Sequence, residues 1–220
     1  MNTRALARQA PRELRIGQAP SLAAILGVPN KARGLVVFAH GSGSGRLSPR
    51  NNYVAARLRD DGMATLLLDL LTPVEEQDRR NVFDIALLAA RLRFAVDWAA
   101  SHSETRDLRP CYFGASTGGA AALRAAADDP RIVAVVSRGG RPDLAGAQAL
   151  GRVRAPTLLI VGELDGVVIE LNAAARDAMR CERDVVIVPG AGHLFEEPGT
   201  LDQVVTLASD WFRRHLGGTR

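Results

Sequence analysis

The sequence predicts an α/β protein with one mostly parallel sheet and helices on both of its faces. Several apolar runs have the length of strands and are continuously hydrophobic, including 34–39, 64–68 and 157–161, as expected for strands buried on both sides. Segments with apolar residues at helical spacing alternate with these runs. The chain has 220 residues and 47% hydrophobic content, enough for one sizeable core.

The expected elements follow one another in a regular order. Segments 13–16 and 21–26 flank a turn and predict an antiparallel opening hairpin. The six later strands are expected at 34–39, 64–68, 111–113, 132–136, 157–161 and 185–188, which makes an eight-stranded sheet. Helices are expected at 51–60, 83–101, 120–127, from 167 to about 180, and 201–216.

The connections between these elements carry further expectations. Asn51 or Asn52 is the candidate cap of the first helix. Segment 72–80 is charged and is expected to be a loop. Only the short segment 143–154 separates the strand at 132–136 from the next one, so no large cap domain is expected.

The domain organisation that we expect is simple. Residues 1–12 are polar and basic and are predicted to be a flexible segment, followed by a single domain at 13–220. No secretory signal or membrane-spanning run is apparent. Cys111 and Cys181 do not suggest a disulfide scaffold, and a cytoplasmic location is expected.

The charge pattern argues against a nucleic-acid partner. The formal net charge is +4, but the basic residues are scattered, and Lys31 is the only lysine. The glycine-rich run 40–45 lacks the spacing and the lysine of a phosphate-binding P-loop, and no G-x-G-x-x-G fingerprint is present. No metal or organic cofactor is expected, and no membrane partner; a homodimer is a candidate state.

The segment 112–119 carries the strongest functional signal. Its G-x-S-x-G pattern lies between a buried strand and a strong helix-forming segment, which is the setting of a nucleophile elbow. Gly114 and Gly118 leave room for a turn that is too tight for side chains. Ser116 would then project from the start of a helix, where the helix dipole favours negative charge.

A serine needs a base, and the base must be held in one orientation by an acid. His193 follows the last strand in a glycine-rich loop and is the candidate base. His102 and His215 lie near the polar ends of helices and are expected to be solvated.

Three carboxylates compete for the role of the acid. Asp165 is favoured because the loop after the strand at 157–161 would return it to the edge of the sheet. Glu163 and Asp69 are its rivals, and a role for Asp165 as a helix cap is the structural alternative.

The remaining site candidates surround the elbow. Backbone N–H groups of Thr117 and Ser42 are expected to form an oxyanion hole. Arg138 and His40 are the candidate substrate-binding residues. Arg138 and Arg141 could hold a substrate carboxylate. A structural role is favoured, in which Arg138 pairs with Asp143 or Glu163.

These residues resemble the serine hydrolases of the α/β-hydrolase superfamily, in the branch related to dienelactone hydrolase. The likeness extends from about Gly34 to Leu216. Stretches 69–76, 137–145 and 193–199 also resemble a hydrolase module that is sometimes fused to a phosphoribosyltransferase. The resemblance implies the α/β-hydrolase fold, with Ser116 as nucleophile, Asp165 as acid and His193 as base.

Two departures limit what the resemblance implies. Dienelactone hydrolases proper carry cysteine at the elbow where this chain has Ser116, so cleavage of dienelactone itself is not expected. No phosphoribosyltransferase segment accompanies the module in this chain, so nothing about nucleotides is carried over.

The expected function is that of a serine hydrolase, which cleaves carboxylic esters with small or flexible acyl groups through an acyl-enzyme. One alternative is a catalytically silent binding module on the same fold, because a fold does not determine a function. Another is a thioesterase, amidase or acyltransferase that uses the same three residues.

Overall fold

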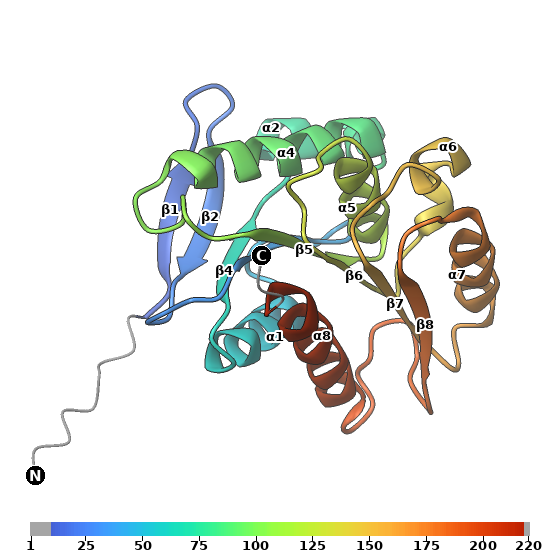
Figure 1. The fold of residues 1–220 in the computed structure, drawn as a ribbon. Coiled ribbons are helices and arrows are strands. Elements are labelled where there is room, and N and C mark those ends of the chain that lie inside the picture. Colours follow the sequence, from blue (N-terminus) through green and yellow to red (C-terminus); the bar gives the residue numbers. More distant parts are fainter. Residues whose placement is uncertain (1–9, 218–220) are drawn as a thin grey trace, which may run out of the picture.

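The computed structural model describes residues 10–217, and they build the predicted eight-stranded sheet (Figure 1). The strands are β1 (Arg12–Ile16), β2 (Leu22–Gly27), β3 (Leu35–Ala39), β4 (Ala64–Leu68), β5 (Pro110–Ala115), β6 (Val135–Arg138), β7 (Thr157–Gly162) and β8 (Arg183–Val188). Their spatial order is β1-β2-β4-β3-β5-β6-β7-β8. β2 runs antiparallel to β1 and β4, and all later neighbours are parallel.

Helices cover both faces of this sheet and divide the core into two layers (Figure 1). On one face lie α4 (Ile85–Ser101), α5 (Thr117–Ala127) and α7 (Gly166–Ala178), and on the other α1 (Pro49–Asp60) and α8 (Thr200–Leu216). The central strands β3 and β5 are buried along almost their whole length, because they carry apolar side chains for both layers. Because strands β3 to β8 run parallel to one another, their carboxyl ends meet at one edge of the sheet.

Several local expectations are wrong in detail. The cap of α1 is Ser48, with Pro49 at the first helical position, and not Asn51 or Asn52. The segment 72–80 is not a loop throughout but contains α2 (Pro73–Glu76) and the start of α3 (Arg79–Val82). A capping box explains α2: Thr72 accepts from the N–H of Glu75, and the Glu75 carboxylate accepts from the N–H of Thr72.

Strand β6 begins and ends later than predicted. It pairs with β5 as far as the elbow, with Ala115 opposite Arg138, so Arg138 is the last strand residue and not part of the following loop. Of the segment expected to be flexible, residues 1–9 lie outside the described residues, and Arg12 is the first residue of β1.

The connection from β6 to β7 is short, as expected. It contains two four-residue helices, the 3-10 helix η1 (Pro142–Ala145) and α6 (Ala147–Leu150). Both pack beside α5 and α7. Within residues 10–217 the chain therefore has no large cap domain over the carboxyl edge of the sheet.

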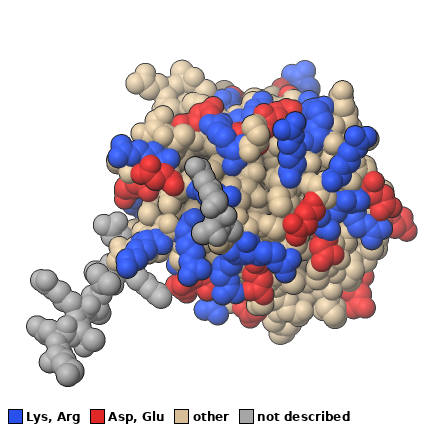
Figure 2. Space-filling view, in the orientation of Figure 1, with Lys and Arg blue, Asp and Glu red and all other residues tan. Residues whose placement is uncertain are grey.

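The surface carries mixed charge. Basic and acidic side chains are interspersed over the face seen in Figure 2. Cys111 and Cys181 are free thiols. None of the helices in the described part of the chain has the length and apolar character that crossing a bilayer requires.

Candidate active site

The elbow between β5 and α5 holds Ser116 in a strained conformation. Its φ of 51° and ψ of −122° lie in a region that residues with side chains seldom adopt. The two flanking glycines are required by contact with backbone. A Cβ at Gly118 would lie 2.1 Å from the carbonyl oxygen of Ala39, and one at Gly114 would lie 2.5 Å from that of Gly118. The elbow thus presses against the end of β3.

The loop after β8 brings His193 to an acid from the loop after β7. Nδ1 of His193 lies 2.6 Å from Oδ2 of Asp165. Asp165 occupies the N-cap position of α7, but its side chain caps no helical N–H. The His193 side chain is 38% exposed and that of Asp165 16%. A polarised imidazole that is still open to solvent can exchange protons with a ligand.

The two rival carboxylates are engaged elsewhere. Oε2 of Glu163 accepts from the N–H of Gly190 at 2.7 Å and shapes the turn before the histidine. Oδ1 of Asp69 accepts from the N–H of Arg46 at 2.6 Å, and its Oδ2 pairs with the Arg46 guanidinium at 2.7 Å. The structure places only Asp165 of these three against His193.

The two expected oxyanion donors lie next to each other. The N–H of Ser42 donates to Oγ1 of Thr117 at 3.0 Å, which ties the loop after β3 to the first turn of α5. Gly41 fits closely against Ser116, because a Cβ there would lie 3.1 Å from Cβ of Ser116.

His40 has no ring nitrogen left for a substrate, so the structure does not support the binding role expected for it. Nδ1 donates to the carbonyl of Gly41 at 2.9 Å, and Nε2 accepts from the N–H of Leu70 at 3.0 Å. One nitrogen that donates and one that accepts define a neutral imidazole. Burial lowers the pKa of His40, against the attraction of the Asp69 and Glu76 carboxylates.

Arg138 is buried without a carboxylate partner among the described residues, and its expected ion pair is wrong. Asp143 pairs instead with Arg141, at 2.7 Å. Arg138 is 6% exposed, its Nε is buried with no hydrogen-bond partner, and its guanidinium lies 5.6 Å from the ring centroid of Phe195. Burial, with a contribution from nearby Arg50, lowers the pKa of Arg138 to about 10.

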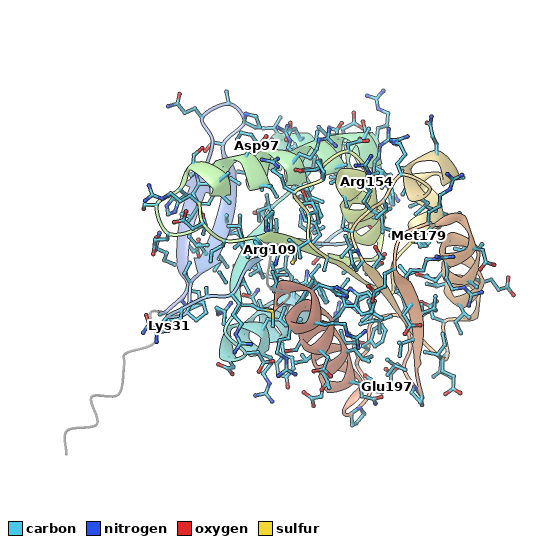
Figure 3. All side chains as sticks on the ribbon, in the orientation of Figure 1. Lys31, Asp97, Arg109, Arg154, Met179 and Glu197 are labelled. Atoms are coloured by element: carbon cyan, nitrogen blue, oxygen red, sulfur yellow. The ribbon has the colours of Figure 1, made fainter. Side chains whose placement is uncertain are left out.

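A pocket of about 520 Å³ opens beside Thr117. It is lined by the loop after β3 and by residues that include Glu76 of α2, Val82 of α3 and Leu88 of α4. A larger hollow of about 810 Å³ lies near the opposite ends of the strands, around Arg109, and includes none of the candidate residues. Figure 3 labels Arg109, which lines the larger hollow, and Glu197. Glu197 lies on the loop between β8 and α8, which also carries His193. We therefore place the candidate site at the carboxyl edge of the sheet.

The other two histidines differ from expectation in part. His215 is not solvated: its side chain is 12% exposed, and its ring packs edge-on against Trp211 with centroids 4.8 Å apart. Burial lowers its pKa. His102 ends α4 and packs on Trp98, with ring centroids 4.5 Å apart.

Sequence reasoning missed two residues that the structure brings to the site. Gly139 lies against His193, and fully buried Asn172 of α7 contacts the loop that contains Gly139. The paired glycines at 139–140 are a sequence signal of close backbone approach, whereas no local pattern marks Asn172. In residues 10–217 no group of three or more His, Cys, Asp or Glu side chains could hold a metal ion.

Among known proteins, two curated relatives are longer than this chain. Two Mycobacterium tuberculosis proteins, provisionally named phosphoribosyl transferases, are 62% identical over 195 residues. The match covers 88% of this chain and 44% of theirs, so the chain spans less than half the length of these relatives. No protein-family model matches the chain.

Solved structures match over nearly full length. A dienelactone hydrolase from Anabaena variabilis is 52% identical, with a TM-score of 0.89, and the match covers 93% of this chain and 98% of that one. The esterase domain of a Rhodothermus marinus protein shares the fold at 20% identity and a TM-score of 0.75, over 94% of this chain and 100% of its own. The chain therefore belongs to the α/β hydrolases, in the branch related to dienelactone hydrolase.

Proposed function

We propose that this chain is a serine hydrolase that cleaves carboxylic esters through an acyl-enzyme formed on Ser116. The observation that carries the proposal is the 2.6 Å contact between His193 and Asp165, at the same sheet edge as a serine with φ of 51°. The chain order of serine, acid and histidine is that of catalytic triads on this fold.

Each residue has one role in the proposed reaction. Ser116 attacks the ester carbonyl while Nε2 of His193 takes the hydroxyl proton, and Asp165 stabilises the imidazolium through Nδ1–H. His193 then gives the proton to the leaving alcohol. A water molecule, activated by the same imidazole, hydrolyses the acyl-enzyme.

The oxyanion of the tetrahedral intermediate would bind to the N–H groups of Thr117 and Ser42. The N–H of Ser42 donates to Oγ1 of Thr117 before substrate arrives. The Thr117 hydroxyl would therefore release this N–H as the oxyanion forms.

The surroundings of the site favour small or flexible acyl groups. The connection after β6 contains only η1 and α6, and the pocket beside Thr117 holds about 520 Å³. An open site of this size offers little surface to enclose a large acyl chain.

Arg138 adds a preference for an anionic group on the ester. A buried guanidinium without a carboxylate is costly, and a substrate carboxylate beside the nucleophile would supply the missing charge. Arg138→Met should lower kcat/KM for an ester that bears a carboxylate and spare its neutral methyl-ester analogue. Arg141→Met is the matched control, because Arg141 already pairs with Asp143. Equal effects of Arg138→Met on both esters would contradict this role.

The alternatives are distinguishable by reaction. A silent binding module would cleave no substrate, whereas a thioesterase, amidase or acyltransferase would use the same triad on another bond or acceptor. The phosphoribosyl transferase name belongs to relatives of which this chain matches 44%, and we assign it no such activity.

A panel of p-nitrophenyl esters, acyl thioesters and amides tests the proposal. We expect short p-nitrophenyl esters to be turned over fastest and Ser116→Ala to abolish their turnover. Faster turnover of thioesters or amides, or ester turnover that survives Ser116→Ala, would contradict it.

A further inference from the structure

The segment Arg138–Arg141, at the end of β6, holds both backbone groups of the nucleophile. The N–H of Ser116 donates to the carbonyl of Arg138 at 3.3 Å. The carbonyl of Ser116 accepts from the N–H of Arg141 at 3.1 Å. A strained residue persists only where its surroundings determine its conformation, and these two bonds contribute to that.

The same segment also supports the base. Gly139 has φ of +53°, and its N–H donates to the carbonyl of Ile160 at 2.8 Å. A Cβ at Gly139 would lie 3.1 Å from the carbonyl oxygen of His193 and 3.6 Å from Cε1 and Nδ1 of its ring. The imidazole of His193 thus packs directly against the backbone of Gly139, and a shift of segment Arg138–Arg141 would move it.

A buried amide fixes the segment from the side of α7. Nδ2 of Asn172 donates to the carbonyl of Gly140 at 3.0 Å and to that of Val168 at 2.8 Å. Asn172 is 0% exposed, and its Oδ1 is buried without a partner. A buried polar atom without a partner is costly, so packing alone would favour an apolar residue here.

The helix that carries Asn172 begins at the acid. Asp165 is the N-cap of α7, and Asn172 lies two turns further along. The bond to Gly140 thereby connects the helix after the acid to the segment that touches both the nucleophile and the base.

We propose that Asn172 is a positioning residue for the reaction: by holding the carbonyl of Gly140, it fixes segment Arg138–Arg141 and with it the placement of Ser116 relative to His193. This inference rests on the proposed function. Asn172 touches no reacting atom and acts only through the segment.

Asn172→Leu removes both donors and keeps a side chain of similar size. We expect kcat for the best ester to fall roughly ten- to hundredfold, as for other small misplacements of reacting groups, with KM changed less than about twofold. The low-field proton resonance of the Nδ1–H of His193 should broaden or shift, because the imidazole moves relative to Asp165.

Thr105→Val is the matched control. Oγ1 of Thr105 is buried and donates to the carbonyl of Ala99 at 2.7 Å, in the loop after α4. The control removes a comparable side-chain-to-backbone hydrogen bond and should lower the melting temperature to a similar extent, with kcat and the His193 resonance unchanged.

The proposal is overturned if Asn172→Leu loses stability like the control but keeps wild-type kcat and an unchanged His193 resonance. If Asn172→Leu does not fold, Asn172→Ser gives the same comparison, because it removes the amide and keeps a polar group at the buried position. An inactive wild-type protein would refute the proposed function instead, and the resonance would still report whether Asn172 positions the imidazole.

Discussion

At the scale of single residues, the proposed mechanism depends on the distinction between Asp165 and nearby Glu163. Both follow β7 within three residues, and only Asp165 contacts His193, whereas Glu163 accepts from the N–H of Gly190. The orienting acid must keep the imidazole in the tautomer that accepts the serine proton at Nε2. The two carboxylates should therefore respond very differently to the same amide substitution.

Asp165→Asn should fold normally and lose most of its activity. In triads of this kind the change lowers kcat by about ten-thousand-fold, or roughly 5 kcal/mol of activation free energy, because the wrong tautomer is held. Steady-state kinetics of Asp165→Asn, with Glu163→Gln and Asp69→Asn as controls, checks this. If Glu163→Gln lost most of its activity while Asp165→Asn kept nearly all of it, the orienting acid would be Glu163.

At the scale of elements, the elbow approaches both the end of β3 and the first turn of α5 closely, which explains the pattern of glycines. Gly114 and Gly118 face backbone atoms, which cannot swing away as the end of a flexible side chain can. Gly166, in the first turn of α7, has open space where a side chain would begin, because a Cβ there would meet nothing within 4 Å. Gly118 at the start of α5 thus has no room for a side chain, whereas Gly166 at the start of α7 has room for one.

Gly118→Ala should destabilise the fold and Gly166→Ala should not. The Cβ at 118 would lie 2.1 Å from a carbonyl oxygen of β3, so the elbow and the strand must separate, at a cost on the order of 3 kcal/mol. Alanine at 166 fits in open space and favours the helix slightly. Urea unfolding measures both changes. Equal stability of the two variants would show that the elbow does not press against β3.

Much of this architecture could be predicted from the sequence because its signals are local. The elbow combines a motif, a strand and a helix within a short stretch, and the buried strands are continuous apolar runs. The α2 helix was missed although Thr72 and Glu75 form a recognisable capping box. The later position of β6 follows from its pairing with β5, a contact between distant segments.

The supporting residues of the site could not be predicted, because they too depend on contacts between segments that are distant in the sequence. The roles of Gly139 and Asn172 depend on which loops meet above the sheet, and the burial of His215 depends on packing against Trp211. Arg138 has carboxylates near it in the sequence, but its place at the end of β6 separates it from them.

At the scale of the whole molecule, two partly buried histidines, His40 and His215, are expected to make stability depend on pH. His40 joins the loops after β3 and β4 as a neutral imidazole, and burial lowers its pKa in the folded state. The unfolded chain, with a histidine pKa near 6.5, therefore binds a proton first as the pH falls. Proton uptake by the unfolded state lowers the free energy of unfolding.

The free energy of unfolding should thus be highest above about pH 6.5 and decrease as the pH falls below that value, until the folded state is protonated too. The slope from His40 alone is at most about 1.4 kcal/mol per pH unit. His215 contributes with the same sign. Urea unfolding between about pH 5 and 7.5 should show a shallower slope for His40→Gln than for the wild-type protein. An unchanged slope would contradict the assignment of His40 as a neutral imidazole in the folded state.

The central claim is that Ser116 is an activated nucleophile, and covalent labelling tests it most directly. Intact-mass spectrometry after incubation with a fluorophosphonate should show one added phosphonyl group per chain, located on Ser116 by peptide mapping. Labelling should disappear in Ser116→Ala and slow strongly in His193→Ala. An unlabelled wild-type protein, or a label on another residue that persists in Ser116→Ala, would contradict the account.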